Sequence, residues 1–147
     1  MTAEQKRFIT AVWNSVRRWG WAPLSVFILH EICTHVIYAY EKWPSVDIPL
    51  HIAGGVAFAV FMFGAIEEFA RQAVIVRPDV LTRAVLVFCA VCTAAVFWEF
   101  AEWESDWLLG TNAQLSLDDT MLDLAMGVLG GAVVVGIALL RSPAKRA

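Results

Sequence analysis

The sequence has few charged residues, and this scarcity restricts the class of protein. Only 17% of the 147 residues are charged, whereas 59% are hydrophobic and the mean hydropathy is +0.64. A soluble globular domain has about 25% charged and about 45–50% apolar residues. The composition therefore argues against a soluble globular domain, a disordered chain and a collagen-like repeat, and the length predicts a single domain.

Other features are missing as well. A net charge of −3 offers no basic face for binding nucleic acid. The three cysteines, Cys33, Cys89 and Cys92, cannot form a full disulfide framework. The chain contains neither a Gly-x-Ser-x-Gly nucleophile motif nor a glycine-rich phosphate-binding loop. The sequence therefore names no reaction through a known catalytic motif.

What the sequence has instead is four long apolar stretches, each near the roughly 20 residues that a membrane-spanning helix needs. They cover about residues 21–40, 48–70, 80–103 and 120–141. Each must be helical, because lipid offers backbone groups no hydrogen-bond partner. Ahead of them, between flanking basic residues, a helical spacing of apolar residues is typical of an amphipathic helix on a membrane surface. These residues are Phe8, Ile9, Val12, Trp13 and Val16.

The sequence therefore predicts an all-α, polytopic membrane protein embedded in a lipid bilayer. Residues 20–141 are expected to form four transmembrane helices in an antiparallel bundle, after an amphipathic cytoplasmic-surface helix at residues 1–19. Residues 142–147 are expected to be a cytoplasmic tail. Every lysine and arginine except Lys42 falls at or just inside one side of these spans. The positive-inside rule then places both termini in the cytoplasm.

Acidic and histidine side chains gather near the other side of the predicted spans. A charged group in a helix centre costs roughly 2.5–3.5 kcal/mol on insertion scales, so such groups need a reason. Successive spans alternate in direction, so the ends of the first and third meet the starts of the second and fourth. All three histidines and at least six carboxylates fall in this outer layer. A shared polar site is therefore expected there.

Spacing within the layer indicates a metal site. Pairs three or four residues apart share a helix face, and inward pairs on four helices are how carboxylate-bridged metal sites are built. The candidate ligands are Glu31, His35, Asp47, His51, Glu99, Glu102, Asp119 and Asp123. So many carboxylates repel one another, and a divalent cation is the simplest neutraliser. Imidazole with carboxylate suits zinc, iron or manganese.

Simpler roles are open for several residues of this polar layer. Asp118 follows Ser116 in the arrangement of a helix cap with an acid in the first turn. Pro49 fits a first helical turn, which would leave Asp47 just outside its helix. His30 lies nearer mid-membrane than the others and is either a hydrogen-bonded packing residue or part of the site.

Two runs of glycine, at residues 54–55 and 127–131, let helices approach closely. They can serve packing within one chain or contact between copies in an oligomer. Both possibilities are open from the sequence.

Three motifs carry a family resemblance. They are Asp47-Ile-Pro-Leu-His51, then Trp98-Glu-Phe-Ala-Glu102-Trp103, then Gly110-Thr-Asn with Leu117-Asp-Asp-Thr-Met-Leu-Asp123 in series. Over about residues 45–135 the chain resembles the uncharacterised YjdF-like inner-membrane family and, more distantly, VanZ-like proteins. The resemblance implies a membrane fold, a bacterial inner-membrane location and shared polar positions. These positions are Asp47, His51, Glu99, Glu102, Asp119 and Asp123.

Two classes of function follow. In the first, an enzyme uses a metal near the outer face to activate water for hydrolysis or transfer on a lipid-linked substrate, with a spare carboxylate as general base. In the second, the protein binds a metal or ligand without catalysis, or is a small assembly or transport subunit. No arginine lies in the outer layer to hold a phosphate, which counts against a phosphatase.

Overall fold

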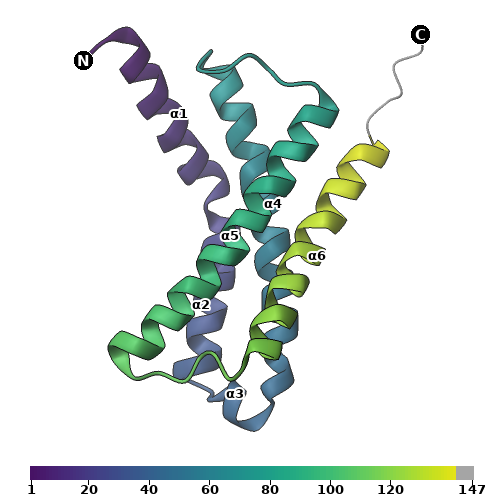
Figure 1. Cartoon of the computed structure of the whole chain (residues 1–147). Helices are drawn as coiled ribbons and strands as arrows, with labels where there is room; N and C mark the ends of the chain where they lie inside the picture. Colours follow the sequence, from purple (N-terminus) through teal and green to yellow (C-terminus); the bar gives the residue numbers. More distant parts are fainter. Residues whose placement is uncertain (142–147) are drawn as a thin grey trace.

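The fold is described from a computed structural model (Figure 1) that covers the backbone of residues 1–141 and their side chains except at positions 41 and 44. These residues form helices and no strand, which confirms the all-α prediction. The elements are α1 (Ala3–Trp19), α2 (Trp21–His35), α3 (Ala39–Lys42), the 3-10 helix η1 (Pro44–Val46), α4 (Asp47–Arg71), α5 (Val80–Leu109) and α6 (Leu117–Arg141). The predicted tail at residues 142–147 lies outside the described residues.

Among the described residues, three helices, α4, α5 and α6, are long and apolar enough to cross a membrane. They match the second, third and fourth predicted spans, although α5 continues beyond the expected end to Leu109. The predicted extent of the first span is wrong, because α2 ends at His35 after 15 residues. Tyr38 then adopts a left-handed backbone conformation (φ 51°) that turns the chain. At 1.5 Å per residue α2 is about 22 Å long, shorter than the hydrocarbon core of about 30 Å.

The first two helices are separated by one residue, Gly20, and the helical conformation continues through it. Gly20 keeps right-handed helical angles (φ −64°, ψ −15°). Its N–H donates to the Val16 carbonyl, and its own carbonyl accepts from the Leu24 N–H. As a result, α1 leads directly into α2, and the two follow one another along the bundle (Figure 1).

Helix α1 packs against the second half of α4. The rings of Phe8 and Phe69 meet edge to face, 5.6 Å between centroids. The Arg18 guanidinium lies 2.9 Å from the Glu68 carboxylate. The structure thus joins α1 to the bundle, whereas its placement on a membrane surface stays a prediction.

The closest helix contacts are made by small residues, and many large apolar side chains face outward. Helices α4 and α6 approach so closely that a Cβ at Gly55 would overlap the carbonyl oxygen of Gly127, and one at Gly130 would overlap that of Ile52. The glycine runs predicted to allow close approach therefore pack within this chain. Large apolar side chains such as Phe97, Phe100, Trp103 and Leu129 are exposed. This distribution is typical of helices packed within lipid, where small residues form the interfaces.

Candidate metal centre

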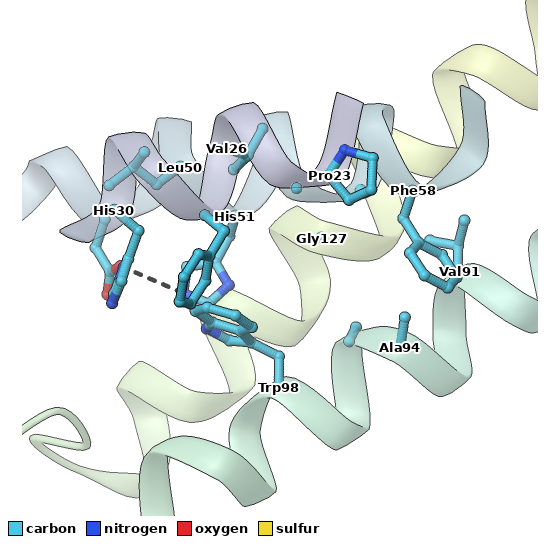
Figure 2. Close-up of a pocket in the computed structure, with 15 residues that line it drawn as sticks. Pro23, Val26, His30, Leu50, His51, Phe58, Val91, Ala94, Trp98 and Gly127 are labelled. Atoms are coloured by element: carbon cyan, nitrogen blue, oxygen red, sulfur yellow. Dashed lines mark ion pairs between the residues drawn. The ribbon is translucent and has the colours of Figure 1, made fainter. Parts of the chain in front are cut away.

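The local structure at the start of α4 brings Asp47 and His51 together. Asp47 is the first residue of α4, and Pro49 is tolerated because the first helical turn has N–H groups without intrahelical partners. The alternative that Asp47 lies outside the helix is therefore wrong. The two residues share a helix face, and the His51 Nε2 lies 3.3 Å from the Asp47 Oδ1 (Figure 2, dashed line).

Two further helices bring a carboxylate each to the same imidazole. The Asp123 Oδ1 on α6 lies 3.7 Å from the His51 Nε2, and the Glu99 Oε1 on α5 lies 3.9 Å from the His51 Nδ1. Asp123 is 3% exposed and Glu99 is 5% exposed. Residues far apart in the sequence thus converge on both nitrogens of one largely buried ring.

The glycine contact between α4 and α6 explains why His51 and Asp123 meet. Gly55 follows His51 by four residues and Gly127 follows Asp123 by four, so each glycine lies one turn beyond its polar partner on the same face. The close approach of these glycines holds the two helices together at this depth. The separation of the two side chains is therefore set by backbone packing.

The loop between α5 and α6 supports Glu99. The Gln114 Nε2 donates to the Glu99 backbone carbonyl at 3.0 Å and to the Glu99 carboxylate at 3.3 Å. The Asp106 carboxylate in turn accepts from the backbone N–H of Ala113 at 2.7 Å and of Gln114 at 2.9 Å. Sequence reasoning did not identify these two supporting residues. The only signal was an acid shortly before the Gly110-Thr-Asn turn.

A second layer of aromatic and polar residues surrounds the cluster. The Trp98 Nε1 donates to the Glu102 carboxylate at 2.7 Å, and the Trp98 ring meets the His30 ring edge to face at 5.3 Å. The His30 Nδ1 lies 2.9 Å from the Tyr40 hydroxyl. His30 thus has the geometry of a hydrogen-bonded packing residue, which is the first of the two roles that the sequence left open.

Tyr40, in the short helix α3, links His30 to the cluster. Burial, together with the charge of nearby Asp47, raises the pKa of Tyr40 far above its ordinary value. The hydroxyl therefore stays protonated and can donate to the carboxylate. Sequence reasoning gave Tyr40 no role, because its contact with Asp47 depends on the turn after α2.

Two overlapping groups among the described side chains have the composition and spacing to hold a metal ion. One is Asp47, His51 and Asp123, and the other is His51, Glu99 and Glu102. Within each group the potential ligand atoms lie within 4.8 Å of one another. In the described part of the chain, the ion pairs of these carboxylates are with His51, and none is with a lysine or an arginine. A cation can therefore offset charge that no basic side chain neutralises.

The structure does not bring Glu31 and His35 to this cluster. They form an i,i+4 pair, 3.5 Å between the His35 Nε2 and the Glu31 Oε2. Their side chains are 42% and 68% exposed, and neither belongs to a group of described side chains that can hold an ion. Their predicted ligand role therefore gains no support from the geometry.

The remaining candidate ligand, Asp119, lies with its neighbour Asp118 in the first turn of α6. The Ser116 hydroxyl accepts from the Asp119 N–H at 3.2 Å, as expected for a helix cap. Asp118 is exposed, and Asp119 is half-buried but lies outside both groups. Of the eight predicted ligands, the structure therefore gathers Asp47, His51, Glu99, Glu102 and Asp123.

These features define a helical membrane protein with a buried histidine–carboxylate cluster. Residues 17–143 match the family described as "Predicted membrane protein (DUF2238)", and the chain belongs to this family. It is also similar to an uncharacterised protein of Thermotoga maritima, with 33% identity over 107 residues. That match covers 72% of this chain and 53% of the relative, so the chain spans about half the length of the curated relative. No solved structure matches the chain significantly.

The family match confirms the resemblance to uncharacterised YjdF-like membrane proteins. Neither match names VanZ-like proteins, and that more distant likeness stays a prediction.

Proposed function

We propose that this protein is a multi-pass inner-membrane protein that binds one divalent metal ion near the outer end of its helix bundle. The proposed ligands are the His51 Nε2 and the carboxylates of Asp47 and Asp123. Zinc, iron and manganese all accept this combination of imidazole and carboxylate.

The spacing of these three ligand atoms carries the proposal. The Oδ1 atoms of Asp47 and Asp123 lie 3.3 Å and 3.7 Å from the same nitrogen. Hydrogen bonds between nitrogen and oxygen are mostly about 2.7–3.2 Å long. Ligand atoms about 2.1 Å from a tetrahedral ion are roughly 3.4 Å from one another. The two observed separations are longer than most such hydrogen bonds and close to the distance between two ligands of one ion.

The other nitrogen of the ring gives Glu99 a positioning role. A metal-bound histidine usually donates its second N–H to a carboxylate or carbonyl, which fixes the tautomer and the ring orientation. The Glu99 Oε1 lies 3.9 Å from the His51 Nδ1, so the two interact through charge at this distance and not through a direct hydrogen bond, and Gln114 restrains the carboxylate. We therefore place Glu99 behind the metal ligands.

For the topology, we propose that both termini are cytoplasmic and that four segments cross the membrane. The distribution of basic residues supports the orientation. Because α2 alone is too short, the last turns of α1 complete the first crossing. The charge of Arg18 enters this crossing paired with buried Glu68, which lowers its cost in lipid.

Metal counting tests the proposal. The protein, purified in lipid nanodiscs and loaded in turn with zinc, manganese and ferrous iron, is dialysed and analysed by mass spectrometry for bound metal. One ion per chain is expected in the wild type and none in His51→Ala or Asp123→Asn. His35→Ala is the matched control, since His35 also pairs with a carboxylate four residues away but stands apart from the cluster. Equal metal content in wild type and His51→Ala for every metal overturns the proposal.

A second candidate function is hydrolysis or transfer on a lipid-linked substrate, and Glu102 favours it. Its carboxylate belongs to the His51 and Glu99 group but not to the proposed ligand set. In ester hydrolysis, water adds to the carbonyl carbon and the acyl C–O bond breaks, which yields a carboxylic acid and an alcohol. Glu102 would accept the proton of the attacking water as general base, and a divalent ion would polarise the carbonyl.

The comparison of wild type with Glu102→Gln separates this enzyme from a non-catalytic metal-binding protein. Metal-loaded wild type should release acid from ester-bearing lipids, and Glu102→Gln should keep the metal and lose the release. If the metal-loaded wild type releases no acid, the result contradicts the hydrolase and supports metal binding without catalysis.

A further inference from the structure

A cavity of about 150 Å³ adjoins the candidate metal centre, with walls from α2, α4, α5 and α6 (Figure 2). Polar and aromatic side chains line the end near the cluster, namely His30, Asp47, His51 and Trp98. Apolar side chains line the other end, among them Pro23, Phe58, Val91 and Ala94. The cavity thus has a polar end and an apolar end.

The helices α2, α4 and α5 each contribute one residue to the polar end of the cavity and another to the apolar end, at the same spacing in each helix. The pairs are His30 with Pro23, His51 with Phe58, and Trp98 with Val91, each seven residues apart. Seven residues are about two helical turns, so the members of a pair share a face and lie about 10 Å apart along the axis. The cavity therefore extends about 10 Å from the polar layer toward the middle of the bundle.

Aromatic rings stand between α2 and α5 at the polar end. The Trp98 ring meets the Phe27 ring at 6.4 Å and the His30 ring at 5.3 Å, both edge to face. Phe27 is also exposed on the outside of the bundle. A side chain of the cavity wall therefore reaches the surface that faces lipid in the proposed topology.

We infer that the cavity binds a single hydrocarbon chain of a membrane lipid, with the oxygen-bearing linkage of that lipid at the His51 end. An apolar cavity of this size accepts an apolar guest, and a hydrocarbon chain would supply the contacts that the apolar end of this cavity lacks. The position of the linkage beside a metal ion rests on the proposed function. The binding of the hydrocarbon chain itself rests on the shape and lining of the cavity.

Gly54 offers a way to fill the cavity without disturbing the fold. It lines the cavity, and a Cβ added there meets no atom within 4 Å. Gly136 on α6 has equally open surroundings but does not line the cavity. Gly54→Leu and Gly136→Leu are therefore a matched pair, since both replace a membrane-helix glycine and only the first occupies the cavity.

Photolabelling tests the inference. The metal-loaded protein in nanodiscs is exposed to a monoacylglycerol with a diazirine at the end of a chain of about ten carbons, suited to a cavity about 10 Å deep. Labelled peptides are mapped by mass spectrometry. In the wild type, label is expected near Phe58 and Val91. In Gly54→Leu the labelling should fall by about fivefold or more, because the new side chain fills the cavity. In Gly136→Leu it should equal that of the wild type. Ala94→Leu fills the cavity from α5 and serves if Gly54→Leu does not fold.

Metal counting on the same samples separates the two proposals. If the protein binds none of the three metals but is labelled in the cavity, the result supports the binding of a hydrocarbon chain and overturns the metal centre. One metal ion per chain, with labelling near Phe58 and Val91 equal in wild type and in both cavity-filling variants, overturns the lipid inference alone.

Discussion

The imidazole of His51 and the carboxylate of Asp123 meet one helical turn from the point where Gly55 and Gly127 bring α4 and α6 into backbone contact. The first two residues supply the chemistry of the candidate site, and the second two set the distance between them. Packing and the polar cluster are therefore coupled, and variants of the glycines should affect both.

Gly55→Ala should destabilise the protein and weaken metal binding together. The added Cβ overlaps the Gly127 carbonyl oxygen, so α4 and α6 must separate. Overpacking of this kind costs about 1–3 kcal/mol. Thermal unfolding in detergent and metal titration measure the two effects, with Gly136→Ala as the control in open space. A Gly55→Ala protein as stable as Gly136→Ala would show that the close contact is not required.

Substitution of Glu99 and Glu102 should locate the ion relative to the His51 ring. Glu99→Gln should lower metal affinity about 10–100-fold, as expected for a group that orients a ligand. Glu102→Gln should leave affinity close to that of the wild type. Titrations with a competing chelator measure both. If instead Glu102→Gln abolishes binding and Asp47→Asn retains it, the ion lies on the Nδ1 side of the ring.

Replacement of both arginines that pair with Glu68 should lower the free energy of unfolding by more than the sum of the two single replacements. The Oε1 of buried Glu68 lies 2.9 Å from the Arg18 Nη1 and 3.3 Å from the Arg71 Nη1. Both arginines are about half exposed, so either single alanine variant should cost about 1 kcal/mol or less. The double variant leaves a buried carboxylate unpaired, which costs about 3–5 kcal/mol. A double-mutant cycle measures the difference, and strictly additive losses would contradict the shared ion pair.

Tyr40 should make stability fall at alkaline pH. Burial and Asp47 raise its pKa in the folded protein above the unfolded value of about 10. A raised pKa stabilises the fold below the unfolded pKa, and this contribution declines as the pH rises above about 10. Wild type should therefore lose stability relative to Tyr40→Phe between about pH 9 and pH 11. A constant difference across that interval would mean that the hydroxyl ionises equally in both states.

Reporter fusions should verify the orientation. An alkaline phosphatase domain, active only outside the cytoplasm, should be active when fused after Lys42 and inactive when fused after Arg77 or after the last residue. The basic residues concentrated at the inner ends of the spans give the physical reason. Activity of the fusion at the C-terminus would reverse the proposed topology and place the polar cluster on the cytoplasmic side.

Much of the helical framework and part of the candidate site were predictable from the sequence. Apolar length identified the three helices that can span a membrane. Spacing of four residues within one helix placed Asp47 beside His51, because that relationship is a property of the helix alone. The extent of α2 was not predictable in this way, since no glycine or proline lies within five residues of the left-handed turn at Tyr38.

The sequence by itself determined that the helices are apolar and that their polar residues collect in one layer, because chain direction alternates and lipid enforces helical backbone. Only the tertiary structure decided which of these residues face one another. Glu31 and His35 have the same spacing as Asp47 and His51 but lie exposed, since the rotation of a helix about its own axis depends on its neighbours. The glycine contacts of α4 with α6 fix that rotation for His51 and Asp123, and no spacing within a single helix encodes it.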